Sequence, residues 1–435
     1  MSSNYSSYPR PMADSGISFH CGANGSYPLG RPEHWALWIE RIKAMGGTWA
    51  KALILSDCKP DPNEQPMIAV KRMVDAGLEV VVRLYREKPY PGILTPRQLA
   101  QISVLVKIGI SYFESGNEPN LNVEWQNHQI GSPESVADDW LVDARALEDV
   151  GGYPGIPACA PGGNVDDIDF MRGFFQRIAT KKASFDRVWI ATHNYVLNHP
   201  LDYPDDPINR GEKPNGTIMD AGESNGFRKF EALNNLSQQY LGLTLPVIAT
   251  EGGPVMDLGF SNDPRYPQLL NESQHAISAK EIAYRMMWNL VPPYYLASCF
   301  WILAGREMES PVSTGFEGHS WFPFWLGDGV QAVRALKVMP KQVRPIIPID
   351  QPPGTVSKED AIRAEIEKVL KWDTFPWLKK EAMRRGLIHT DITTEIPITY
   401  NEKKYLVQVY GNTVLGCTGS YTESETFQFP FFKEG

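Results

Sequence analysis

The chain has 435 residues, of which 42% are hydrophobic and 21% charged, so it can bury a sizeable core and is not expected to be disordered. Its net charge of −9 and its lack of an Arg/Lys-rich arm argue against nucleic acid as a partner. No apolar run reaches the ~18 residues of a membrane helix, so we expect no membrane partner either. The length suits one large barrel and a smaller module.

The N-terminal segment, residues 1–15, is polar and rich in Ser, Tyr and Pro, and we expect it to be flexible. It lacks the apolar core of a secretory signal, which predicts a cytoplasmic protein, or a secreted one whose leader is absent from this sequence. The five cysteines are an odd number, form no CxxC motif and have no close histidine, so we predict neither a disulfide framework nor a metal site. We also expect no cofactor.

Eight β-like runs alternate with amphipathic helical patterns, an order that is typical of a parallel sheet covered by helices. Eight such units over about 330 residues favour an α/β fold of the (β/α)8 TIM-barrel class, spanning residues 16–344. The predicted strands are Gly16–Asn24, Thr48–Ser56, Leu78–Leu84, Ile110–Gly116, Ile156–Pro161, Arg187–Tyr195, Leu245–Glu251 and Tyr294–Leu303.

The composition changes after Arg344, where several prolines indicate a linker. Two charged helices, 358–372 and 376–385, are predicted next. A hairpin with its turn at Gly411-Asn412 follows. We therefore expect residues 345–435 to form a linker and a small C-terminal helix-hairpin module, an α+β extension of the barrel.

Two glutamates end predicted barrel strands: Glu118 follows the fourth, and Glu251 ends the seventh. Catalytic groups of this fold lie at the carboxyl ends of its strands. Glycoside hydrolysis needs one carboxylic acid to protonate the leaving oxygen and a second carboxylate to assist at the anomeric carbon. The pair therefore predicts a glycosidase.

The sequence Asn117-Glu118-Pro119 together with Glu251 resembles the clan A, or 4/7, superfamily of retaining glycoside hydrolases. The run 117–121 is similar to family 39, and His193-Asn194-Tyr195 is similar to the His-x-Tyr of family 5. The resemblance implies that Glu118 is the acid/base, that Glu251 is the nucleophile of a double displacement on β-glycosidic bonds, and that Asn117 binds the sugar 2-hydroxyl. Gly252 departs from the Glu-Trp of family 39, which leaves the family open.

Other candidate substrate-binding residues lie near strand ends. The resemblance implies that Tyr195 holds the nucleophile and that Trp301 forms the floor of the sugar site. His193 is two residues before Tyr195, so both side chains point to one face. Arg83 is a charged residue flanked by apolar residues in the third predicted strand. We expect its guanidinium to pair with a catalytic or a structural carboxylate. His20 and Asn24, near the first strand's end, are further candidates for contacting a hydroxyl.

Several competing functions are disfavoured. A metal-dependent barrel hydrolase would want His-x-His after the first strand, where the chain reads His20-Cys21-Gly22. No convincing lysine ends a strand for Schiff-base chemistry. A non-catalytic carbohydrate-binding barrel is the alternative that the sequence leaves standing. The sequence leaves open the sugar, exo or endo action, the oligomeric state and the role of the C-terminal module.

Overall fold

A computed structural model describes residues 8–9, 16–21, 32–86, 88–181, 184–204, 206, 226–255, 266, 272–288, 290–304, 319–322 and 327–339, and four C-terminal strands between 396 and 430. The chain divides into two compact units, residues 1–341 and 342–435. Among the described helices, none combines the length and apolarity that crossing a bilayer requires.

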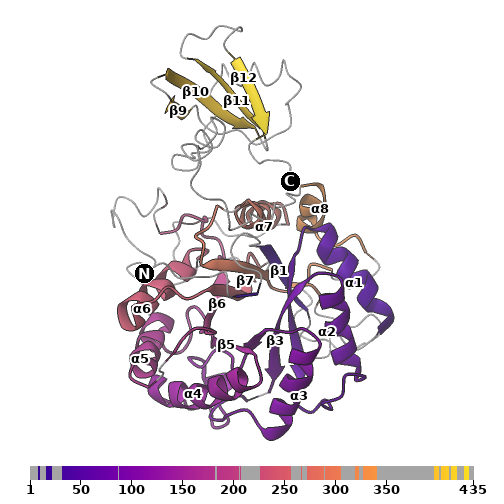
Figure 1. Ribbon diagram of the computed structural model, residues 1–435, viewed down its shortest axis with the longest axis vertical. Coiled ribbons are helices and arrows are strands. Elements are labelled where there is room, and N and C mark those ends of the chain that lie inside the picture. Colours follow the sequence, from indigo (N-terminus) through magenta and orange to yellow (C-terminus); the bar gives the residue numbers. More distant parts are fainter. Residues whose placement is uncertain are drawn as a thin grey trace. The chain divides into compact units, whose positions relative to one another are not determined.

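The first unit is a closed barrel of eight parallel strands in the order β1 to β8, in which β8 pairs with β1. The predicted (β/α)8 TIM barrel is thereby confirmed. Figure 1 shows helices around the outside of the strands. The strands are β1 (Gly16–Cys21), β2 (Trp49–Leu55), β3 (Glu79–Tyr85), β4 (Tyr112–Glu114), β5 (Tyr153–Ile156), β6 (Trp189–Tyr195), β7 (Val247–Gly253) and β8 (Tyr295–Phe300).

The helices of the barrel begin where the sequence carries N-terminal signals. Proline occupies the first turn of α2, α3 and α4, and Thr95 caps α3 with a capping box that includes Gln98. The helices are α1 (Pro32–Ala44), α2 (Gln65–Asp75), α3 (Pro96–Lys107), α4 (Pro133–Asp149), α5 (Asp167–Ala179), α6 (Lys229–Leu241), α7 (Glu272–Met287) and α8 (Gln331–Val338).

One strand lies outside its predicted position. The run 156–161 was expected to be the fifth strand, whereas β5 is Tyr153–Ile156 and pairs with β4 and β6. The sequence Tyr-Pro-Gly-Ile contains two poor strand formers, which hides the strand from a propensity argument. Gly155 is required there because a Cβ would lie 2.4 Å from the ring of Trp189.

The interior of the barrel is built in layers. A lower layer of apolar and aromatic side chains includes Trp49, Tyr112 and Trp189. The rings of Tyr112 and Trp189 meet edge to face at 5.7 Å, and Trp49 lies 5.4 Å from Tyr112. Tyr8 joins this layer, and its hydroxyl donates to the Val188 carbonyl over 2.9 Å. The lower half of the barrel is therefore a packed core.

The second unit contains an antiparallel sheet in the order β12-β11-β10-β9. Its strands are β9 (Ile396–Tyr400), β10 (Lys403–Tyr410), β11 (Thr413–Thr418) and β12 (Thr426–Pro430). The predicted hairpin is present, because Tyr410 pairs with Thr413 across the turn. The predicted helices 358–372 and 376–385 lie outside the described residues.

Candidate active site

The direction of the Glu251 side chain depends on a β-bulge in β7. Alternate residues of a strand point to opposite faces. Ile248 belongs to the interior layer, so regular alternation would turn Glu251 toward the helices. The pairing of β6 with β7 shifts between Thr192 and His193, which leaves Thr250 as an extra residue and pairs His193 with Glu251. Such a bulge re-aims the side chain that follows it, and Glu251 points into the barrel.

Inside the barrel, Glu251 is 5% exposed, and both of its carboxylate oxygens have polar partners. Its Oε1 accepts hydrogen bonds from Lys51 Nζ at 3.1 Å and from Arg83 at 3.3 Å. Its Oε2 accepts one from the Tyr195 hydroxyl at 3.0 Å. Burial, and then the negative charge of Glu251, raise the pKa of Tyr195 well above its ordinary value, so this tyrosine stays a neutral donor. These contacts favour an ionised Glu251 in spite of its burial.

Glu118 follows β4 on a backbone that turns sharply. Its φ of 37° lies in the left-handed region, which is uncommon for a residue with a side chain and is concentrated at functional sites. The Glu118 amide donates to the Ala158 carbonyl at 2.9 Å. The fully buried Asn120 side chain ties the same loop to the segment after β5 through the carbonyls of Ala160 and Val165. The conformation of Glu118 is thus held from two sides.

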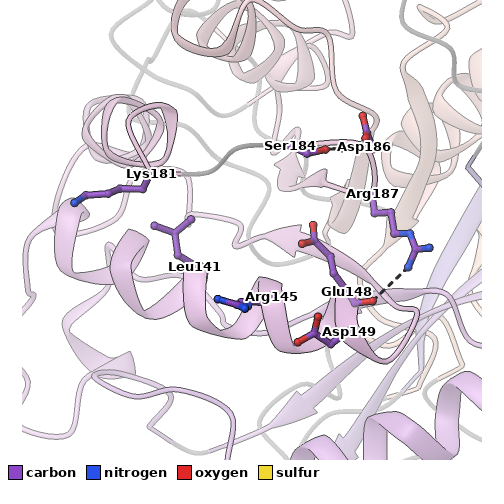
Figure 2. Close-up of a pocket in the computed structure, with 8 residues that line it drawn as sticks. All are labelled: Leu141, Arg145, Glu148, Asp149, Lys181, Ser184, Asp186 and Arg187. Carbon is purple, nitrogen blue, oxygen red and sulfur yellow. Dashed lines mark hydrogen bonds between the residues drawn. The ribbon is translucent and has the colours of Figure 1, made fainter.

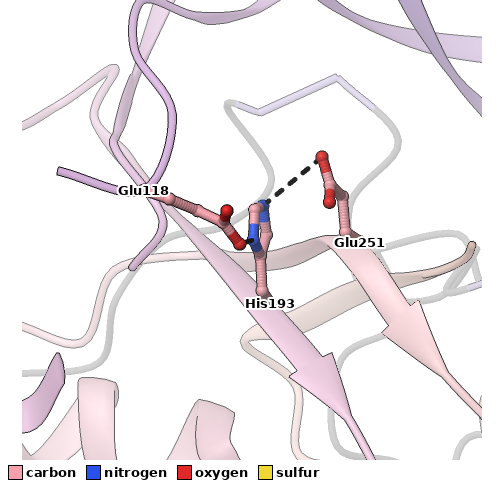
Figure 3. Close-up of side chains that lie close together, drawn as sticks. All are labelled: Glu118, His193 and Glu251. Carbon is pink, nitrogen blue, oxygen red and sulfur yellow. Dashed lines mark hydrogen bonds and ion pairs between the residues drawn. The ribbon is translucent and has the colours of Figure 1, made fainter. Parts of the chain in front are cut away.

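His193 lies between the two glutamates, as Figure 3 shows. Its Nδ1 is 2.7 Å from Oε1 of Glu118, and its Nε2 is 3.8 Å from Oε1 of Glu251. One carboxylate oxygen of Glu118 and one of Glu251 lie within 4.8 Å of each other. The carboxyl groups of retaining glycosidases lie about 5–5.5 Å apart, and those of inverting enzymes about 6.5–9.5 Å apart. Both carboxylates are therefore close enough to act on one bond between them.

A second layer of charge lies under Glu251. Glu114 of β4 is 1% exposed, and its Oε2 is 2.9 Å from Lys51 Nζ. Its Oε1 accepts a hydrogen bond from the Thr250 hydroxyl at 2.8 Å. Burial by itself raises the pKa of Glu114, but the charges of Lys51 and Arg83 outweigh burial and hold that pKa below its ordinary value. Glu114 is therefore a buried anion, and it compensates the cations that contact Glu251.

Asn117 lies in a chain of polar contacts beside Glu118. Its Oδ1 accepts a hydrogen bond from Arg83, and its Nδ2 donates to Glu124 Oε1 at 3.0 Å. Burial raises the pKa of Glu124 to about 7, and the negative charge of Glu118 adds to this rise. A cavity of about 20 Å³, roughly the room of one water, adjoins Arg83, Asn117 and Glu124.

The remaining sequence candidates are placed unequally. Trp301 follows β8 directly instead of lying within it, and its amide donates to the Gly252 carbonyl at 3.0 Å, which brings it next to the residue after Glu251. The backbone of His20 lies in β1, paired with Lys51 of β2, and its side chain lies outside the described residues, as does all of Asn24. The structure thus brings together Glu118, Glu251, Asn117, His193, Tyr195 and Arg83.

Sequence reasoning missed Lys51, Glu114 and Glu124 as members of this cluster. Lys51 carried a signal, because it is a lone charge in the apolar strand Trp49–Leu55, and Arg83 is likewise flanked by apolar residues in β3. Glu114 lay within the predicted fourth strand, two residues after Tyr112 and so on the same face. No pattern in the sequence indicated Glu124, because only the folding of the loop after β4 brings it to Asn117.

Glu118, His193 and Glu251 have the residue types of a metal site, with ligand atoms within 4.8 Å of one another. Lys51 and Arg83, however, already contact the same oxygen of Glu251 that faces His193. A divalent cation at that oxygen would face two positive charges at close range. The cluster is therefore poorly suited to hold a divalent cation.

Another hollow, of about 720 Å³, lies apart from this cluster between α4 and the segment that leads into β6 (Figure 2). Its lining mixes cations such as Arg145 and Lys181 with anions such as Asp149 and Asp186. Arg187 donates to the Glu148 carbonyl at 3.3 Å. None of the predicted site residues lines this hollow.

Fold and site together define a (β/α)8 barrel with a close carboxylate pair at the carboxyl ends of β4 and β7. No protein-family model matches the chain, and no curated protein matches its sequence. Its structural neighbours include glycoside hydrolases of families 39 and 5, at low sequence identity.

Three of these solved structures illustrate the likeness. A family 39 glycoside hydrolase from Bacteroides cellulosilyticus is 10% identical with a TM-score of 0.49, over 94% of this chain and 72% of that chain. A family 39 enzyme from Xanthomonas axonopodis is 14% identical with a TM-score of 0.47, over 95% and 74%. A Bacteroides ovatus family 5 xyloglucanase is 14% identical with a TM-score of 0.41, over 75% and 74%. At such values, the function has to be argued from the site.

Proposed function

We propose that this protein is a retaining glycoside hydrolase that cleaves β-glycosidic bonds of an oligo- or polysaccharide by double displacement. The observation that carries the proposal is the approach of Glu118 and Glu251 within 4.8 Å at the mouth of the barrel, with a different environment for each. Cations and a tyrosine hydroxyl contact Glu251, whereas Glu118 contacts His193. Two unlike carboxylates are what acid and nucleophile require.

In the first step, a Glu251 oxygen attacks the anomeric carbon while the glycosidic oxygen leaves and takes the proton of Glu118. In the second step, a water oxygen attacks the same carbon, its proton passes to Glu118, and the electron pair of the broken ester bond returns to Glu251. Tyr195 and Arg83 hold the Glu251 carboxylate for attack. We propose that Asn117, which contacts Arg83 and Glu124, binds the sugar's 2-hydroxyl and that Trp301 stacks on the ring.

The test is a panel of p-nitrophenyl β-glycosides and oligosaccharides of glucose, mannose, galactose and xylose, with product analysis by NMR. Glu251→Ala is expected to abolish turnover, and azide should partly restore it with an inverted glycosyl azide. Glu118→Ala should keep turnover of aryl glycosides with good leaving groups, and azide should give a retained product. Substantial activity of Glu251→Ala on the natural type of linkage would refute the assignment.

The alternative is a carbohydrate-binding barrel without catalysis. It predicts that the wild-type protein binds oligosaccharides and releases no product from any member of the panel. The presence of both Glu118 and Glu251, with the buried cations that keep a nucleophile charged, favours the enzyme, because binding alone needs no second, charge-compensated carboxylate.

A further inference from the structure

Lys51 is a buried lysine that contacts the proposed nucleophile and has no part in the mechanism above. It comes from β2, and its side chain is 1% exposed. The ammonium lies 2.9 Å from Oε2 of Glu114 and 3.1 Å from Oε1 of Glu251. A lysine is costly to bury unless its charge is compensated. Here the ammonium group contacts two carboxylates, which come from β4 and β7 on different sides of the barrel.

The charges of this layer balance only while Glu251 is ionised. Lys51 and Arg83 supply two positive charges, and Glu114 and Glu251 supply two negative ones. When Glu251 becomes a neutral glycosyl ester, the layer is left with one uncompensated positive charge. Lys51 lies 3.1 Å from Oε1 of Glu251, inside the barrel, where the screening by water is weak. It therefore favours the state in which Glu251 regains its negative charge.

The geometry points to Lys51 as a catalytic residue of the second step, one that stabilises the carboxylate of Glu251 as it leaves the anomeric carbon. This inference rests on the proposed function. During that step the carbon–oxygen ester bond breaks and its electron pair returns to Glu251, which accepts the hydrogen bond of the Lys51 ammonium. Lys51 itself gives up no proton, and Glu114 holds it in place.

The two steps respond oppositely to this cation. In the first step Glu251 loses charge, so a cation stabilises the starting carboxylate at least as well as the transition state. In the second step Glu251 gains charge, and the same cation stabilises the transition state more than the ester. Removal of Lys51 should therefore slow breakdown of the intermediate selectively, which is a split that a merely structural residue does not produce.

The test uses the double variant Lys51→Met/Glu114→Gln, which removes the cation and its buried partner together and leaves Arg83 to balance Glu251. With a 2,4-dinitrophenyl β-glycoside of the sugar that the wild type accepts, glycosylation is fast and kcat reports the second step. A hydrogen bond to a charged group is worth enough to lower kcat by about 10- to 100-fold. KM should fall by a similar factor, kcat/KM should change little, and a burst of one equivalent of phenolate should appear.

A matched control is the double variant Lys229→Met/Asp167→Asn. Lys229 is another buried lysine, 2.5 Å from Asp167, and it also donates to the carbonyl of Cys159. This control should lower the temperature of unfolding and show neither the burst nor the parallel fall of kcat and KM. Lys51→Met alone, which leaves Glu114 and Glu251 to share Arg83, should in addition move the acidic limb of kcat/KM to higher pH.

The outcomes separate this inference from the proposed function. An active wild type whose Lys51→Met/Glu114→Gln variant keeps its kcat and shows no burst overturns the role of Lys51 and leaves the glycosidase standing. A fall in kcat/KM with unchanged kcat also overturns it, because the loss then lies in the first step. A wild type that cleaves no glycoside overturns the proposed function itself, and this inference with it.

Discussion

The lower and upper halves of the barrel interior are built from the same strands, but the lower half is aromatic and the upper half is charged. In the lower half, Trp49, Tyr112 and Trp189 fill the space with rings in edge-to-face and tilted contacts. In the upper half, the next inward-facing residues of β2 and β4 are Lys51 and Glu114, each two residues after its aromatic neighbour. Burial of the aromatic rings in the lower layer stabilises the fold. The upper layer buries charges, which would destabilise the fold if they were not paired with opposite charges. The residues that stabilise the fold and the residues that carry charge are thus separated along the barrel axis.

The largest effect should follow Glu251→Gln in the charged layer, which keeps the shape of the side chain and removes the charge that Lys51 and Arg83 contact. Activity per folded molecule should fall on the order of 10⁴-fold or more, as expected for loss of a nucleophile, and can be measured on an aryl glycoside. The control Thr250→Val, at the preceding residue, loses only the hydrogen bond to Glu114, so it should retain most activity. Equal losses in both variants would contradict the role proposed for Glu251.

A smaller effect, confined to stability, is expected in the lower layer. Trp49 is fully buried, and Trp49→Ala should reduce the free energy of unfolding by about 3–5 kcal/mol. Denaturant unfolding measures this loss. The kcat of the folded fraction should stay near that of the wild type if the two layers are independent. A fall in kcat that matches the loss of stability would show that the aromatic layer also positions the charged one.

The smallest effect should come from Glu124, at the edge of the charged layer, where the pKa is raised to about 7. Because the folded state holds this proton more tightly than the unfolded chain, stability falls as pH rises from about 4.5 to 7. Glu124→Gln should remove that decline and raise stability at pH 8 by on the order of 1–2 kcal/mol, allowing for solvent screening. Thermal unfolding from pH 4 to 8 tests this. A steeper decline in the variant would contradict it.

The barrel and its two glutamates were predictable because both depend on local patterns. Alternation of strands and helices predicts the barrel, and the ends of the fourth and seventh strands carry Glu118 and Glu251. The pairing of Tyr195 with Glu251 came from the resemblance to clan A, and its 3.0 Å hydrogen bond agrees with the predicted contact. The catalytic roles of all these residues stay predictions.

The charged layer was not predictable, because it arises from contacts across the barrel. Lys51 meets Glu251 across 200 residues of sequence, and Thr250 meets Glu114 across 136. Nothing near Lys51 in the sequence indicates which carboxylates it will contact. The bulge was hidden for a related reason, since an extra residue in β7 is visible only against the register of β6. The position of β5 was predicted wrongly for another reason. Pro154 and Gly155 are poor strand formers, so the strand forms because it pairs with β4 and β6 and not because of its own residues.

The bulge of β7 also bears on how activity in such a barrel is inherited. Because the extra residue interrupts the alternation, Thr250 and Glu251 both face the barrel interior, where they contact Glu114 and Lys51. A descendant that lost Thr250 would keep Glu251 opposite His193, because Glu251 would then follow Ala249 directly and alternate inward. The strand should therefore tolerate the gain or loss of one residue at this point during evolution without displacing the carboxylate.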